Sequence, residues 1–75
     1  MTATALDIVY STRYKNLLLE DLKHLLCKSD EEKAKKLLTK LDGYIHAHEK
    51  FEHHTIKKNL KTAIEMREVV KEKKL

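Results

Sequence analysis

Histidine is the residue type with the clearest chemical potential in this chain of 75 residues. Four of its five histidines lie within nine residues, and two glutamates stand among them: His46, His48, His53 and His54, with Glu49 and Glu52. Imidazole and carboxylate side chains are typical zinc ligands. On a helix, His46, Glu49 and His53 would share one face, which makes them the candidate metal ligands.

The spacing of these residues argues against a single metal ion. The shared face from Asp42 to His53 would be about 16 Å long at 1.5 Å per residue, so only neighbouring pairs could share a metal. The His-Glu-x-x-His and Glu-x-x-His patterns of helical metal sites are absent from the sequence. We predict no cofactor, and instead two acid–imidazole pairs on a surface helix, Asp42 with His46 and Glu49 with His53. A metal site completed by a second protomer is the less favoured alternative.

Few side chains could serve as a catalytic nucleophile. The sequence holds two serines and one cysteine, Ser11, Ser29 and Cys27. Ser29 is explained as a helix cap, Ser11 lies among polar helix positions, and Cys27 falls at a predicted helix end. A chain of three short helices also offers little room for a catalytic pocket. We therefore predict neither enzymatic activity nor a small-molecule substrate.

The composition indicates the fold class that would carry these residues. The chain has no proline and one glycine, whereas strands and nucleotide-binding loops depend on frequent turn residues. We predict an all-α chain that forms one domain over residues 1–75. The single cysteine allows no disulfide within the chain. Because the sequence has no long apolar run and no signal-peptide pattern, we expect no membrane association and a cytoplasmic location.

Capping signals and apolar spacing predict three helices, over residues 4–27, 30–52 and 55–72, with a frayed tail at 71–75. The expected caps are Thr4 with Asp7, Ser29 with Glu32, and Thr55 alone. Gly43 is interpreted as a glycine within the second helix, because the apolar spacing passes through it unchanged. The alternative is one continuous helix from residue 30 to about residue 73, a long hairpin that would require a dimer.

The first predicted helix has a wide apolar surface. Its expected core-facing stripe is Leu6, Tyr10, Tyr14, Leu17, Leu18, Leu22 and Leu25. Ile8, Leu19 and Leu26 lie beside this stripe and widen the apolar surface past half of the circumference, which is more than one neighbouring helix can cover. We therefore predict that the chain forms an interface with a second copy or another protein through Ile8, Leu19, Leu26, His48 and Phe51.

The two later helices carry narrower apolar stripes. The second stripe is Ala34, Leu37, Leu38, Leu41, Tyr44, Ile45, His48 and Phe51. The third is Ile56, Leu60, Ala63, Ile64, Arg67 and Val70. The two stripes are out of phase with one another, which predicts a break between the helices near residues 53–55.

The net charge of +4 comes from residue 55 onward, where seven basic residues face three acidic ones. Lys57, Lys58 and Lys61 would share one helix face that could attract a phosphate backbone. Only Arg13 and Arg67 are arginine, and no aromatic residues alternate with these lysines, so base recognition is poorly supported.

The sequence therefore predicts an all-α, three-helix unit that assembles as a helical-bundle dimer. The predicted function is that of a small non-enzymatic interaction protein, an adaptor or regulator that presents an apolar helix face. The alternative is a small basic regulator that binds DNA or RNA through the lysine-rich third helix.

Overall fold

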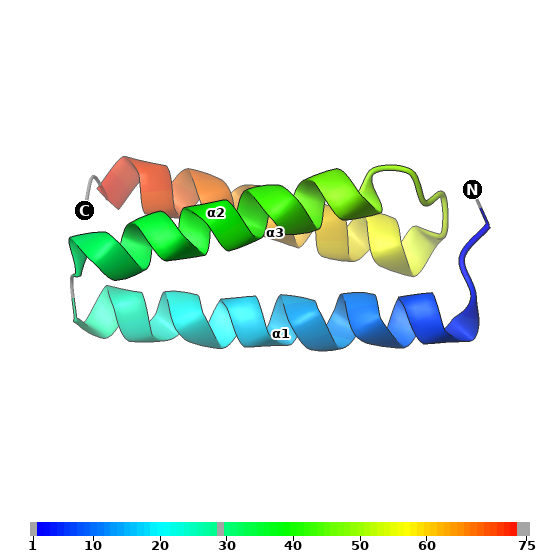
Figure 1. Ribbon diagram of the computed structural model, residues 1–75, viewed down its shortest axis with the longest axis horizontal. Coiled ribbons are helices and arrows are strands. Elements are labelled where there is room, and N and C mark those ends of the chain that lie inside the picture. Colours follow the sequence, from blue (N-terminus) through cyan, green and yellow to red (C-terminus); the bar gives the residue numbers. More distant parts are fainter. Residues whose placement is uncertain (1, 29, 74–75) are drawn as a thin grey trace.

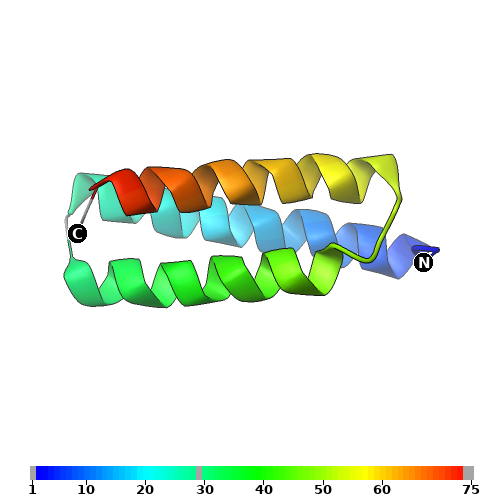
Figure 2. The same ribbon diagram turned by 90° about the horizontal axis from the view of Figure 1, so that it is seen from above.

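The computed structural model describes residues 2–28 and 30–73, which form three α-helices. They are α1 (Ala5–Cys27), α2 (Glu31–His48) and α3 (His54–Lys73). Figure 1 shows an up-down-up bundle in which α2 runs antiparallel to α1 and α3, and Figure 2 shows the same arrangement from above. The prediction of an all-helical, three-helix chain is confirmed.

The helix starts follow from their caps. In the predicted capping box of α1, the Thr4 hydroxyl accepts the Asp7 N–H at 3.2 Å and the Asp7 carboxylate accepts the Thr4 N–H at 2.9 Å. The N-cap of α2 is Asp30, whose carboxylate accepts two backbone N–H groups of the first turn. The predicted cap Ser29 lies outside the described residues.

The break between α2 and α3 is longer than predicted and begins earlier. α2 ends at His48 rather than at residue 52, and α3 begins at His54. The prediction that Thr55 is the N-cap is wrong, because the Thr55 N–H is itself bound, at 3.1 Å, by Nδ1 of His53. The continuous helix that we considered as an alternative is not formed. α3 continues through Lys73, past the start of the expected fraying, and residues 74 and 75 lie outside the described residues.

One apolar core draws on all three helices. The stripe predicted for α2 is confirmed, since five of its members are buried and Leu38, His48 and Phe51 are half-buried. On α3, Asn59 and Met66 are buried in addition to the predicted Ile56, Ala63 and Val70. The buried apolar residues are Leu18, Leu22, Leu25, Ala34, Leu37, Leu41, Tyr44, Ile45, Ile56, Ala63, Met66 and Val70.

The orientation of α1 differs from the prediction. Leu6, Tyr10, Tyr14 and Leu17, which we expected in the core, are exposed. The prediction that Leu18, Leu22 and Leu25 face the core is confirmed, and Ser11, which we did not predict there, is buried with them. Ser11, Leu18 and Leu25 recur at seven-residue intervals, or about two helical turns, so a straight helix that buries these two leucines also turns Ser11 inward.

A buried polar network accommodates Ser11 and joins the three helices. The hydroxyl oxygen of Ser11 lies 2.9 Å from that of Tyr44. The Tyr44 hydroxyl group donates a hydrogen bond to the Ser11 carbonyl oxygen at 2.8 Å. The Asn59 amide donates to the hydroxyl oxygens of Ser11 and Thr12, both at 3.1 Å. Because buried polar groups need partners, these contacts fix how the helices are rotated against one another.

The capping box of α1 makes stability sensitive to acid. The backbone hydrogen bond from Thr4 lowers the pKa of the Asp7 carboxyl group, helped by the Thr4 hydroxyl and the charges of Lys50 and His48. The ionised Asp7 carboxylate therefore contributes to the free energy of unfolding above its ordinary pKa of 3.8. This contribution is lost as the pH falls through the lower folded-state pKa. We expect Thr4→Ala to lower Tm at neutral pH by about 4–8 °C, the effect of losing an N-cap worth about 1 kcal/mol.

Thr4→Ala should also flatten the fall of Tm below about pH 4, because it removes the hydrogen bonds that lower the Asp7 pKa. Melting curves followed by circular dichroism between about pH 2 and pH 7 measure both effects. The double variant Thr4→Ala/Asp7→Asn should be little worse than either single variant, since the two residues act as a pair. Parallel pH profiles of wild type and Thr4→Ala would contradict this account.

Tyr44 makes stability sensitive to alkali. Burial raises the pKa of its phenol, and the hydrogen bond with Ser11 opposes that rise. The neutral Tyr44 phenol therefore contributes fully to the free energy of unfolding below its ordinary pKa of 10.0. This contribution is lost as the pH rises through the higher folded-state pKa. We expect Tyr44→Phe to cost about 1 kcal/mol at neutral pH, the usual contribution of a buried hydrogen bond, and to lose less stability than wild type above about pH 10.

Chemical denaturation between about pH 7 and pH 11, together with tyrosinate absorbance, tests the Tyr44 prediction. The matched control is Tyr10→Phe, because Tyr10 is 64% exposed and takes no part in the polar network. Equal stability of the Tyr44→Phe and Tyr10→Phe proteins at neutral pH would contradict the assigned role of the network.

Candidate functional site

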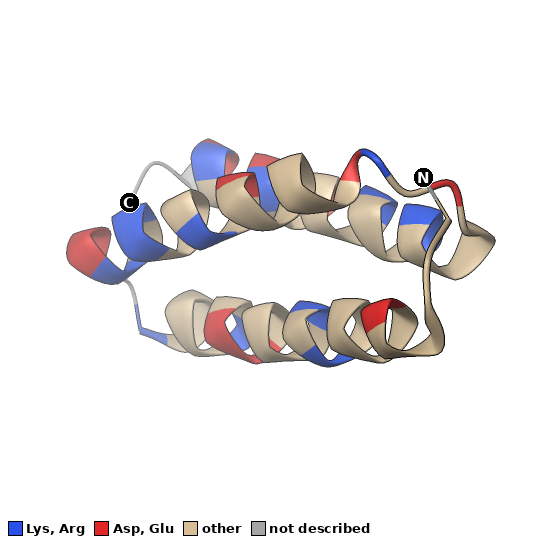
Figure 3. Cartoon of the chain, turned by 45° about the vertical axis from the view of Figure 1, so that its right-hand side comes forward, with Lys and Arg blue, Asp and Glu red and all other residues tan. Residues whose placement is uncertain are grey.

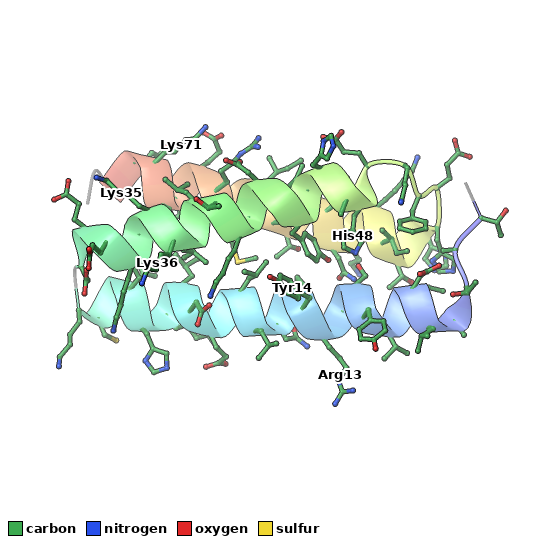
Figure 4. All side chains as sticks on the ribbon, viewed as in Figure 1. Arg13, Tyr14, Lys35, Lys36, His48 and Lys71 are labelled. Carbon is green, nitrogen blue, oxygen red and sulfur yellow. The ribbon has the colours of Figure 1, made fainter. Side chains whose placement is uncertain are left out.

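The exposed side of α1 carries a row of large apolar side chains. Leu6, Tyr10 and Leu17 are 63–64% exposed, and Val9 and Tyr14 are 49% and 44% exposed. Single exposed apolar residues are common on proteins, but a contiguous group marks a contact surface. These five residues recur at steps of one, three or four along one side of α1, and we call them the α1 apolar face. Figure 4 shows Tyr14 on the α2 side of α1 and Arg13 pointing away from the other two helices.

A hollow lies beside this face, between α1 and α2. It has a volume of about 310 Å3, and Tyr10, Tyr14, Gly43 and Ala47 line it together with Lys40, Tyr44 and His48. Gly43 lies within α2, as predicted. A Cβ atom added to Gly43 would meet nothing within 4 Å, so the packing of this chain does not require a glycine there. We call this hollow the glycine groove.

Stacked rings form one wall of the glycine groove. The ring centroids of Tyr14 and Tyr44 are 5.8 Å apart, and those of Tyr44 and His48 are 4.2 Å apart. Phe51 continues the row at 5.9 Å from His48. Nδ1 of His48 lies 2.8 Å from the Tyr44 carbonyl oxygen, which can only accept, so this nitrogen carries a proton. The wall is therefore held by hydrogen bonds as well as by stacking.

The structure places the predicted interface residues differently from the α1 apolar face. Ile8 and Leu19 are half-buried, and Leu19 packs against the core. Leu26 is 43% exposed. His48 and Phe51 are half-buried in the row of rings. The sequence prediction missed the face because it overlooked the seven-residue spacing from Ser11 to the core leucines, which was the available signal.

The histidine cluster is divided among different structural roles. Asp42 binds Arg67, with 3.3 Å between the carboxylate oxygen and Nη1, rather than the predicted His46. The predicted pair of Glu49 and His53 does not lie on a helix, because α2 ends at His48 and both residues fall in the α2–α3 connection, where Nδ1 of His53 caps α3. The rings of His53 and His54 stack with centroids 4.5 Å apart.

The same division affects the candidate metal ligands His46, Glu49 and His53. Within residues 2–28 and 30–73, no three His, Cys, Asp or Glu side chains come together in a group that could hold a metal ion. A catalytic zinc site normally takes three protein ligands.

The three lysines of the predicted nucleic-acid surface lie near the start of α3. Lys57, Lys58 and Lys61 are all exposed. The core-facing residues of this segment are Ile56 and Asn59, so the lysines occupy the remaining, outer side of the helix. Figure 3 shows basic and acidic segments interspersed along the bundle, and the outer side of α3 also carries the exposed Glu65 and Glu68. The basic surface is therefore small.

None of the described helices is both long enough and apolar enough to cross a membrane.

Comparisons of the chain with protein-family models, with curated proteins and with solved structures found no match.

Proposed function

We propose that the protein is a small, non-enzymatic interaction module that works as a homodimer, in which the α1 apolar faces of two copies pack against each other. The observation that carries this proposal is the exposure of the α1 apolar face beside the glycine groove. A partner that covers such a face would stabilise the complex by about 25 cal/mol for each Å2 of apolar surface removed from water. The non-enzymatic role is supported by Ser11, a candidate nucleophile whose hydroxyl is engaged in the polar network.

The spacing of the α1 apolar face favours a second copy as the partner. Together with the exposed Arg13, the face occupies positions 6, 9, 10, 13, 14 and 17, and the intervals between them read the same in both directions. A two-fold axis that crosses α1 between residues 11 and 12 would therefore pair Leu6 with Leu17 of the partner and Val9 with Tyr14 of the partner. Most protein dimers use such self-complementary contacts about a two-fold axis.

The same antiparallel arrangement explains why Arg13 and Gly43 lie at this surface. It sets Arg13 beside Tyr10 of the partner, where a guanidinium group can lie over the aromatic ring. It also brings Val9 of the partner toward Tyr14 at the edge of the glycine groove, where Gly43 leaves room for close approach. A glycine within a helix costs about 1 kcal/mol relative to alanine, and this close approach accounts for its presence.

Substitutions on the exposed face test the dimer. We expect wild type to elute with twice the chain mass in size exclusion with light scattering at tens of micromolar. Tyr10→Lys or Leu17→Lys should raise the dimer Kd by about 30-fold or more, the effect of losing an interface residue worth about 2 kcal/mol. Helicity should be retained, because both side chains are exposed within the single chain. The matched control is Ile64→Lys on α3, which removes another exposed apolar side chain and should leave the dimer intact.

Gly43→Leu gives a second, independent test. The added Cβ meets nothing within 4 Å and leucine has a higher helix propensity than glycine, so the single chain should become more stable. The same side chain would fill the glycine groove and weaken the dimer. A wild-type monomer at these concentrations, or equal effects of Leu17→Lys and Ile64→Lys on the dimer, would overturn the proposal.

A further inference from the structure

A second groove lies at the other end of the α1–α2 contact. It has a volume of about 720 Å3 and is formed by the last turns of α1 and the first half of α2. Its floor includes the core residues Leu25 and Leu37, and its walls carry four lysines, Lys28, Lys33, Lys36 and Lys40. We call it the lysine groove. Figure 4 shows Lys36 in the space between α2 and α1, and Figure 3 shows acidic as well as basic segments at this end of the bundle, since α2 begins with Glu31 and Glu32.

Among the residues that line the lysine groove, four lysines face one acidic side chain, while Glu31 and Glu32 of the first turn of α2 lie outside the lining. Asp21 and His24 are the other ionisable side chains of its walls apart from Cys27, and Asp21 is paired with Lys40 at 3.7 Å. In the part of the chain that the structure describes, Lys28, Lys33 and Lys36 form no ion pair. Lys28 lies at the negative end of α1, but Lys33 lies near the positive end of α2, where a cation is unfavourable.

We propose that the lysine groove binds a small anion that carries several phosphate groups, an oligophosphate. Lysine ammonium groups bind phosphate as flexible point charges, whereas arginine provides the planar fork suited to paired oxygens. Lys33, Lys36 and Lys40 recur along α2 over about 10 Å at 1.5 Å per residue, a span longer than one phosphate group. The groove also has the volume of a typical small-ligand site, about 300–1,000 Å3.

The apolar floor strengthens this interaction. Leu25 and Leu37 are each 3% exposed and keep water from one side of the bound anion. Attraction between charges grows as the surrounding medium becomes less polar. The lysine groove involves the end of α1 from Asp21 onward and its C-cap Lys28, whereas the α1 apolar face ends at Leu17. The site therefore stays accessible in the proposed dimer and does not depend on it.

Calorimetric titration of the full chain with sodium tripolyphosphate tests the proposal. At about 50 mM salt we expect a Kd below about 100 µM, and a marked loss of affinity at about 200 mM salt. Lys33→Ala/Lys36→Ala should weaken binding at least about 10-fold, since it removes two charge-assisted contacts. The matched control is Lys57→Ala/Lys61→Ala, which removes the same charge from exposed positions on α3 and should change Kd less than about twofold.

Titration with orthophosphate distinguishes an oligophosphate site from a site for a single phosphate group, because one phosphate group can reach only part of the row of lysines. We expect it to bind at least about 10-fold more weakly than tripolyphosphate. Circular dichroism should show equal helicity in both lysine variants, since all four substituted side chains are exposed. The absence of tripolyphosphate binding at low salt, equal losses in the two lysine variants, or orthophosphate binding as tightly as tripolyphosphate would each overturn the proposal.

Discussion

The buried contact among Ser11, Tyr44 and Asn59 is the constraint on which the arrangement of this bundle depends. The bundle measures 38 × 16 × 15 Å, so its core is thin and most of its apolar contacts are non-directional. Leucine faces alone would tolerate several rotations of one helix against another. Buried hydrogen bonds do not tolerate such rotations, because a buried hydroxyl or amide left without a partner costs about 1–3 kcal/mol. The network therefore selects one rotation for each of the three helices.

The exposed face of α1 is a consequence of that selection. Once Ser11 points inward, Tyr10 and Leu17 are turned away from the core, because they lie about 100–120° around the same straight helix from Ser11. The chain thus presents an apolar surface near the start of α1, whereas the lysine groove lies near its end. One helix pair, α1 and α2, therefore offers two surfaces of different chemistry, one suited to an apolar partner and one to an anion.

The histidines show how tertiary contacts reassign a dense sequence cluster. Their number within nine residues suggests metal chemistry, but each ring position depends on where α2 ends. His48 lies on α2 and stacks on Tyr44, and His53 caps α3. Asp42 forms an ion pair with Arg67 of α3. Each contact serves the local structure, and together they separate residues that a continuous helix would have aligned.

The sequence by itself determined the fold class, the number of helices, the capping box at Thr4 and the core face of α2, because these depend on local spacing and capping. It placed Gly43 within a helix for the same reason. Only the tertiary structure decided which side of α1 is buried. The apolar surface of α1 is too wide for periodicity to choose one side, and the choice came from partners 33 and 48 residues away along the chain, Tyr44 and Asn59. Both grooves likewise exist only where two helices meet, so no local pattern could reveal them.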